Sequence, residues 1–305
     1  MKKMLERILT DCAQHTKDGA VASYIPELSK ANPADFGICI VKGAGDITAV
    51  GDCDKPFTMQ SVIKPIILLL ALEDNGVEVV NQLCGVEATG KPFDAFNYSD
   101  RALTSEHINP MINAGAIALC TLIKGQTYTE KFQRLLNLAR RLAGNDSLSL
   151  NESVYLSEKA TGNKNRALAY MLKAYNMIDD DVEDVLDTYF KACSIQATCK
   201  DLAKIAFVLA SHGFSDTENV QIVSPEHARY VNAIMAICGM YDGSGEFALN
   251  VGIPAKSGVG GGIMAVAPRR MGIGIYSPAL DTKGNSLAGV KAIEMLGKEI
   301  DLSVF

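Results

Sequence analysis

Hydrophobic positions form short strand-like runs near both ends of the chain and follow helical spacing in its middle. Apolar runs at 36–42 and 47–51 flank a glycine-rich turn, which predicts a β-hairpin. Two further runs, at 262–268 and 271–277, flank a pair of arginines and predict a second hairpin.

Helical periodicity dominates from residue 61 to about 240, and a helix is also predicted at each end, over 1–12 and 287–300. The helices predicted in the middle include 131–142, 166–175, 202–210 and 227–238.

Strands at both ends and helices between them predict an α+β fold, with an antiparallel sheet built from both chain ends and flanked by helices. We expect a single domain over 1–305. Its sheet layer would come from about 1–57 and 245–305, and its helical region from about 58–244.

Length, composition and charge limit the class of protein. With 305 residues, 48% of them hydrophobic, the chain can bury a substantial core. Its net charge of −6 is spread without long runs, which argues against nucleic acid or an anionic membrane as a partner. Residues 1–12 have charges within their apolar spacing, so we expect an amphipathic helix there and not a secretory signal, and no apolar run approaches the roughly 20 residues of a membrane span. We therefore expect a cytoplasmic protein.

The cysteine and histidine patterns indicate neither disulfides nor a metal. The eight cysteines are scattered without a Cys-x-x-Cys pair, so we expect reduced, buried thiols. None of the four histidines is spaced with another metal ligand, so we expect no metal site. His107 lies in a polar turn, and a histidine-based triad has no support from spacing.

The first candidate for chemistry is Ser61-Val-Ile-Lys64, which opens an apolar helix. Residues i and i+3 project from one helical face, so the Lys64 amine can reach the Ser61 hydroxyl. A lysine held neutral by burial can take the serine proton. Pro65 lacks an N–H, which predicts a helix start near Gln60 or Ser61, with Ser61 at the positive end of the helix dipole.

Ser-x-x-Lys alone is a weak signal, because a capping serine and a solvated lysine give the same pattern. Two observations favour the functional interpretation. The run 65–72 is apolar all round, so its helix is expected to be central. Far along the chain, Lys256-Ser257-Gly258 matches the Lys-Thr/Ser-Gly strand motif that β-lactamases and penicillin-binding proteins place beside their nucleophile. The glycines at 258–262 allow close backbone approach to a ligand, or form only a flexible loop.

The remaining candidates each have an ordinary structural interpretation as well. Asn113 would cap a helix over 114–123, and Glu158 would be a solvated surface carboxylate. Asn165 follows Glu158 by two helical turns, although Gly162-Asn163 suggests a break between them. Of three tyrosines, Tyr24 would pack against the first helix, Tyr189 would be a half-buried aromatic, and Tyr241 lies in a glycine-rich turn where a core position is less expected.

Together, however, these segments match one family in order and over nearly the whole chain. They are 24–26, 51–52, 60–65, 109–116, 157–158, 165–166, Tyr189, 244–246, 254–262 and 284–286. On these segments the chain resembles the serine-dependent glutaminases of bacteria and mitochondria. The resemblance implies a β-lactamase/transpeptidase-like fold and hydrolysis of L-glutamine to L-glutamate and ammonia.

The resemblance also implies a role for each candidate. Ser61 would attack the side-chain amide and form a γ-glutamyl ester, with Lys64 as its base. The backbone N–H groups of Ser61 and Val259 would form the oxyanion hole. The residues implied to contact the substrate, besides Ser61 and Val259, are Tyr24, Asn113, Glu158, Asn165, Tyr189 and Tyr241. A carboxylate suits the ammonium of glutamine, and amide or hydroxyl donors suit its carboxylate.

Tyr189 and Tyr241 are also implied to be catalytic, since a phenol can relay the proton to departing ammonia and later activate water. The resemblance implies no cofactor. It implies L-glutamine as the small-molecule partner and a homo-oligomer, either a dimer or a tetramer.

Two alternatives stay open. A β-lactamase or a peptidoglycan D-Ala peptidase would share the nucleophile, but such enzymes act outside the cytoplasm and the chain shows no export signal. A non-catalytic ligand-binding protein would keep the fold without turnover, although the joint presence of Ser61, Lys64, Tyr189 and Tyr241 speaks against it.

Overall fold

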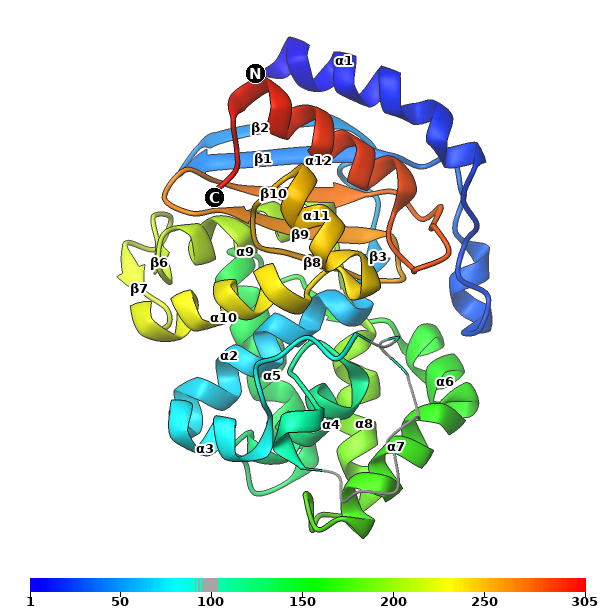
Figure 1. The fold of residues 1–305 in the computed structure, drawn as a ribbon, viewed down its shortest axis with the longest axis vertical. Helices are drawn as coiled ribbons and strands as arrows, with labels where there is room; N and C mark the ends of the chain where they lie inside the picture. Colours follow the sequence, from blue (N-terminus) through cyan, green and yellow to red (C-terminus); the bar gives the residue numbers. More distant parts are fainter. Residues whose placement is uncertain (91, 93, 95–103) are drawn as a thin grey trace.

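A computed structural model describes residues 1–90, 92, 94 and 104–305. Within these ranges, a five-stranded sheet lies beside a group of helices (Figure 1). The sheet has the order β2-β1-β10-β9-β8, and all neighbouring strands are antiparallel. Its strands are β1 (Gly37–Gly43), β2 (Asp46–Gly51), β8 (Ala255–Ser257), β9 (Gly262–Ala267) and β10 (Met271–Tyr276).

Both predicted hairpins are present, as β1–β2 and β9–β10, and they join through β1 and β10. Gly37 lies opposite Tyr276, and Ile40 lies opposite Ile273. The two ends of the chain therefore build one antiparallel sheet, which confirms the fold class predicted from the hydrophobic pattern.

The two faces of the sheet pack against different helices. Ile40 packs into a core with α1 (Lys2–Cys12) and α12 (Leu287–Ile300). Its neighbour Cys39 points to the opposite face, because strand side chains alternate, and joins the core formed with the middle helices. Helix α9 (Cys199–Ala210) lies against this second face.

Helix α9 can approach the sheet closely because β10 carries a glycine beneath it. A Cβ atom at Gly274 would lie 2.0 Å from the carbonyl oxygen of Cys199 and 2.6 Å from the amide nitrogen of Ala203. Any larger residue would push the helix away from the sheet. This contact holds the helical region against the sheet.

The helical region surrounds α2 (Lys64–Asn75), in which every residue from Lys64 to Leu72 is buried. The prediction of a central apolar helix is therefore confirmed. The other elements are α3 (Val77–Leu83), α4 (Asn113–Leu122), α5 (Tyr128–Ala143), α6 (Glu152–Thr161), α7 (Asn163–Ala174), α8 (Val182–Cys193), α10 (Pro225–Cys238) and α11 (Ser244–Asn250), with β3 (Phe57–Thr58), β4 (Ser149–Leu150), β5 (Ile195–Ala197), β6 (Phe214–Ser215) and β7 (Val220–Gln221).

The predicted helices are present, but several begin earlier than their apolar spacing indicates. Helix α5 begins behind Thr127, whose side chain accepts a hydrogen bond from the N–H of Glu130. Helix α9 begins behind a capping box formed by Thr198 and Asp201. Capping residues set these starts, and the polar first turn carries no hydrophobic repeat from which to locate them.

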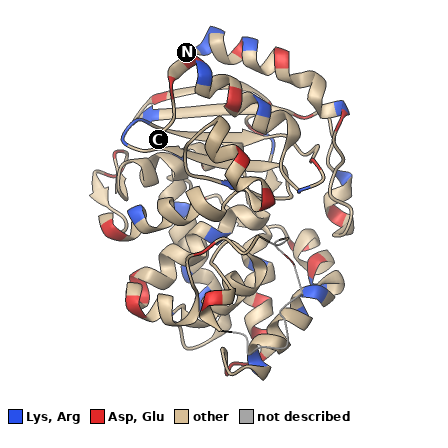
Figure 2. Cartoon of the chain, viewed as in Figure 1, with Lys and Arg blue, Asp and Glu red and all other residues tan. Residues whose placement is uncertain are grey.

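The structure shows the state of the cysteines and the distribution of the charged residues. All eight cysteines are buried free thiols, as predicted. Basic and acidic residues are interspersed along the part of the chain that the structure describes (Figure 2). Among the helices that the structure describes, none combines the length and the apolar character required to span a bilayer.

Candidate active site

Ser61 lies where the chain passes from β3 into the central helix. A 3-10 turn, Gln60–Ile63, comes first, and α2 starts only at Lys64. The N–H of Lys64 donates to the carbonyl oxygen of Ser61. Pro65 has no backbone N–H and therefore cannot donate a hydrogen bond to this oxygen. The start predicted near Ser61 is therefore a 3-10 turn, and the α-helical register begins three residues later.

The residue before Ser61 has an uncommon backbone conformation. Gln60 is buried and has a φ of +48°, a region that non-glycine residues seldom occupy. Its side chain hydrogen-bonds to the carboxylate of Glu158, and its Nε2 lies 3.3 Å from Oγ1 of Thr58. Strain of this kind persists only where the surroundings hold it. The turn therefore fixes Ser61 and Glu158 relative to each other.

Lys64 is buried, with 0% of its surface exposed, so the interpretation as a solvated lysine is wrong. Its Nζ donates to Oδ1 of Asn113 at 2.6 Å and to the carbonyl of Met111 at 3.2 Å. Burial lowers the pKa of Lys64 to about 8, although the neighbouring Cys193 and Glu158 side chains oppose the shift. The amine thus gives up its proton more readily than an ordinary lysine.

Asn113 joins this amine to two other predicted site residues. Its Oδ1 also accepts a hydrogen bond from the Tyr189 hydroxyl at 3.3 Å, and its Nδ2 donates to Oδ1 of Asn165 at 2.9 Å. Helix α4 begins at Asn113 behind Ile112, and no side chain caps it. The interpretation of Asn113 as an N-cap is therefore wrong, since its amide is used within the cluster.

Tyr241 reaches Ser61 from a distant part of the chain. It begins the 3-10 turn Tyr241–Gly243 with a φ of +53°, and it is buried, contrary to the expectation for a glycine-rich turn. Its hydroxyl lies close to the side chain of Ser61 and to the backbone of Val259. Burial raises the pKa of Tyr241, while these two neighbours oppose the rise. The phenol therefore keeps its proton beside Ser61.

A second buried lysine packs on the ring of Tyr241. The Nζ of Lys256 lies 4.2 Å from the ring centroid and donates to the carbonyls of Gly239 at 3.0 Å and Ser257 at 2.5 Å. Burial, together with the charge of Lys64, lowers the pKa of Lys256 well below its ordinary value. Strand β8 thus brings the Lys-Ser-Gly motif next to the turn that carries Ser61.

The glycines that follow this motif form a buried, hydrogen-bonded turn and not a flexible loop. The N–H of Gly261 donates to the carbonyl of Gly258 at 2.9 Å. A Cβ atom at Gly260 would lie 2.4 Å from the carbonyl oxygen of Thr58, so only glycine fits there. This close approach brings the backbone of Val259 to the hydroxyl of Tyr241.

A pocket of about 330 Å³, which we call the substrate pocket, opens beside Ser61. Its lining gathers the predicted residues Tyr24, Ser61, Asn113, Glu158, Asn165 and Tyr189. Three other predicted residues are not among the described lining residues: Lys64, Tyr241 and Val259. The Lys64 amine hydrogen-bonds to Asn113, and the Tyr241 hydroxyl lies close to Ser61 and to the backbone of Val259. Asp94 and Lys164 also line it and form an ion pair of 2.6 Å.

Glu158 is buried in this pocket, so the interpretation as a solvated carboxylate is wrong. It is 5% exposed, and its Oε2 has no hydrogen-bond partner among the described residues. Burial raises the pKa of Glu158 to about 8, against the hydrogen bond from Gln60 and the charge of Lys64. A buried carboxylate oxygen without a partner is a site for a cationic group.

Three further predictions concern the helix break at Gly162-Asn163 and the positions of Tyr189 and Tyr24. The predicted break at Gly162-Asn163 is confirmed, since α6 ends at Thr161 and α7 begins at Asn163. Tyr189 is fully buried and not half-buried. Tyr24 is 57% exposed and lines the substrate pocket, so the prediction that it only packs against the first helix is wrong.

Sequence reasoning assigned no role to Gln60 or Cys193, both of which line the substrate pocket. A signal existed for Cys193, because it follows Tyr189 by four residues and shares its face of α8. The backbone conformation of Gln60 had no sequence signal. Within the described residues, no group of three or more His, Cys, Asp or Glu side chains is placed to hold a metal ion.

Comparisons with known proteins show which family and which solved structures this chain resembles. A sequence model of the family described as Glutaminase matches residues 19–305. Glutaminase 2 of Clostridium perfringens (strain 13 / Type A) and the glutaminase of Clostridium tetani (strain Massachusetts / E88) are each 49% identical over 305 residues, which is 100% of both chains.

A solved structure shows the covalent complex between a Bacillus subtilis glutaminase and 5-oxo-L-norleucine, formed by reaction with 6-diazo-5-oxo-L-norleucine. It is 36% identical to this chain, with a TM-score of 0.91, and the match covers 100% of this chain and 99% of that one. The fold is therefore the α+β, β-lactamase-like fold of the bacterial glutaminases, as predicted.

Proposed function

The chain belongs to the glutaminase family, and from this premise we propose that Ser61 is the nucleophile with which it hydrolyses the side-chain amide of L-glutamine. A glutaminase is an amidohydrolase, which favours this activity over the β-lactamase alternative. The observation that supports the residue assignment is the complete burial of Lys64, three residues after Ser61, together with the closeness of the Tyr241 hydroxyl to the Ser61 side chain.

Recognition of the substrate uses the substrate pocket. The unpartnered Oε2 of Glu158 accepts the α-ammonium of glutamine. Tyr24, Asn113 and Asn165 supply hydroxyl and amide donors for the α-carboxylate. The side-chain amide then extends toward Ser61. A substrate analogue that lacks the α-ammonium leaves the buried carboxylate of Glu158 without a partner.

Acylation forms one bond and breaks another. The Oγ of Ser61 attacks the amide carbon, and its proton passes to the neutral Nζ of Lys64. The N–H groups of Ser61 and Val259 stabilise the oxyanion, where each such donor contributes roughly 10²–10³ in rate. The C–N bond breaks as the nitrogen receives a proton from Lys64 by way of the Tyr241 hydroxyl. Ammonia leaves, and a γ-glutamyl ester remains on Ser61.

Deacylation runs the same chemistry with water in place of ammonia. A water molecule loses a proton to the Tyr241–Lys64 pair and attacks the ester carbon. The ester C–O bond breaks, Ser61 recovers its proton, and glutamate departs. The homo-oligomer that the resemblance implies and the cytoplasmic location expected from the sequence stay predictions.

The test is ammonia release by the purified protein with L-glutamine and, separately, L-asparagine. We expect turnover of glutamine and none in Ser61→Ala, which should still bind glutamine. A protein that releases no ammonia from glutamine would contradict the proposed activity. Turnover by Ser61→Ala near the wild-type rate would contradict the residue assignment alone.

A further inference from the structure

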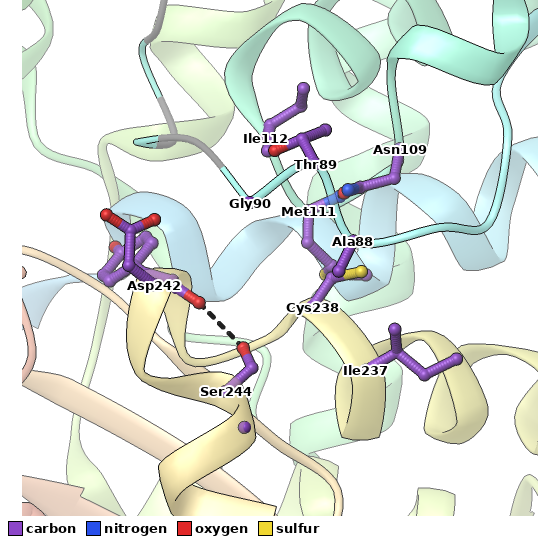
Figure 3. Close-up of a pocket in the computed structure, with 12 residues that line it drawn as sticks. Ala88, Thr89, Gly90, Asn109, Met111, Ile112, Ile237, Cys238, Asp242 and Ser244 are labelled. Atoms are coloured by element: carbon purple, nitrogen blue, oxygen red, sulfur yellow. Dashed lines mark hydrogen bonds between the residues drawn. The ribbon is translucent and has the colours of Figure 1, made fainter.

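A second cavity of about 230 Å³ lies next to the catalytic groups. Figure 3 shows its walls, which come from the loop at 88–90, the segment before α4, the end of α10 and the turn at 241–245. The hydroxyl of Ser244 ties this turn together by donating to the backbone carbonyl of Tyr241 at 2.9 Å (Figure 3).

Two wall residues touch the proton-handling groups directly. Tyr241 lines the cavity, and its hydroxyl lies close to the side chain of Ser61. Met111 also lines it, and its carbonyl accepts the hydrogen bond from Nζ of Lys64. Neither Tyr241 nor Met111 is among the described residues that line the substrate pocket. The second cavity and the substrate pocket therefore meet the catalytic groups from different sides.

The proposed reaction requires an exchange while the substrate pocket is occupied. After acylation, the γ-glutamyl group stays on Ser61 with its ammonium at Glu158. It therefore blocks the route from Ser61 to the opening of the substrate pocket. Ammonia must nevertheless leave and one water molecule must arrive. The leaving nitrogen and the incoming water occupy the same position, beside the Tyr241 hydroxyl. A water molecule takes up only about 30 Å³ of liquid volume, so the second cavity has room for several.

We propose that the second cavity is the passage through which ammonia leaves and hydrolytic water enters while the acyl group occupies the substrate pocket. The inference rests on the proposed function and specifies how its two steps are connected. The inner walls are mainly apolar, with Met111, Ile112 and Cys238. Such walls let neutral ammonia and water pass but disfavour the ammonium ion, whose charge would lose its hydration.

The mouth of the passage offers sites for narrowing or widening it without touching the catalytic groups. Ala88 and Asp242 are exposed there, and Ile237 is 45% exposed on the opposite wall (Figure 3). Ala88→Phe would narrow the opening, and Ile237→Ala would widen it. Ala44→Phe, in the exposed β1–β2 turn, is the matched control for adding an aromatic ring to the surface.

The experiment measures glutamine turnover and capture of the acyl-enzyme by hydroxylamine, a nucleophile larger than water. For Ala88→Phe we expect kcat to fall by about tenfold, the equivalent of about 1.4 kcal/mol in the barrier, with KM not raised. The ratio of γ-glutamyl hydroxamate to glutamate should fall in Ala88→Phe and rise in Ile237→Ala. General damage to the fold would not move this ratio in opposite directions.

The possible results distinguish failure of the proposed passage from failure of the proposed function. Wild-type kcat and an unchanged product ratio in both passage variants would overturn the inference, provided the wild type and Ala44→Phe hydrolyse glutamine normally. If Ala88→Phe lowers the melting temperature, the ratio in Ile237→Ala decides instead, and an unchanged ratio overturns the passage. A wild-type protein that makes no glutamate would contradict the proposed function itself.

Discussion

The Nζ atom of Lys64 lies 2.6 Å from Oδ1 of Asn113 and 3.2 Å from the carbonyl oxygen of Met111. A neutral lysine amine has two N–H groups and one lone pair. When both N–H groups are donated to these two oxygens, the lone pair is the position at which the amine accepts a proton. Asn113 therefore orients the Lys64 amine, the proposed base, and also lines the substrate pocket.

The first prediction concerns pH. We expect kcat/KM for glutamine to rise with pH through about 8. Burial lowers the pKa of Lys64 to about 8 and raises the pKa of Glu158 to about 8. Below that pH the base is protonated and the ammonium-binding carboxylate is neutral, so both changes reduce activity. Initial rates from about pH 6 to about pH 10 test this. If kcat/KM rose instead around pH 6.5, the ordinary pKa of histidine, the result would contradict this prediction.

Asn113→Asp should shift the acid limb of the pH profile, which is the pH range over which kcat/KM rises. The new carboxylate would lie beside the Lys64 amine and stabilise its protonated form, raising the pKa of Lys64 by about 1–3 units. The acid limb of kcat/KM should shift to higher pH by a similar amount. The position of the limb is independent of any loss of substrate contact, which changes only the height of the profile. An unshifted limb would remove Lys64 from the role of base.

Glu158→Gln should act mainly on binding. The amide cannot supply the charge that holds the α-ammonium, and hydrogen bonds to charged groups contribute about 1.5–3 kcal/mol, so KM should rise by about 10- to 100-fold. Glu152→Gln, an exposed carboxylate on the same helix, is the control. An unaltered KM in Glu158→Gln would argue against the ammonium contact.

The same variant should alter stability in a pH-dependent way. The pKa of Glu158 is raised in the folded protein, so the native state favours the proton and loses stability as pH rises from the unfolded value of 4.5 toward about 8. Glu158→Gln removes this loss. Its melting temperature should exceed that of the wild type at pH 8, by roughly 2–4 °C for each kcal/mol recovered, and match it near pH 4. A difference independent of pH would contradict the assignment.

Local patterns predicted much of the fold and singled out Ser61 and Lys64 as candidates for chemistry. The i, i+3 spacing of Ser61 and Lys64 is a local relationship, and the apolar run after it located the central helix. Strand alternation and glycine-rich turns located both hairpins. Helix starts were displaced at Thr127 and Thr198, because caps and not periodicity set them.

The rest of the site depends on long-range contacts that no local pattern encodes. Asn113, Glu158 and Tyr241 meet Ser61 and Lys64 only through the packing of α4, α6 and the turn before α11, and each had a plausible ordinary interpretation. Only the order of matched segments in a family resemblance singled them out. The positive φ of Gln60 and the packing of Lys256 on Tyr241 required the structure.

The central claim is that Ser61 carries the acyl group, and reaction with 6-diazo-5-oxo-L-norleucine tests it most directly. Mass spectrometry of peptides from the treated protein should find one 5-oxo-L-norleucyl group on Ser61. Excess glutamine should protect against this labelling, and Ser61→Ala should show neither the label nor turnover. A label on another residue, with glutamine hydrolysis retained in Ser61→Ala, would contradict the account.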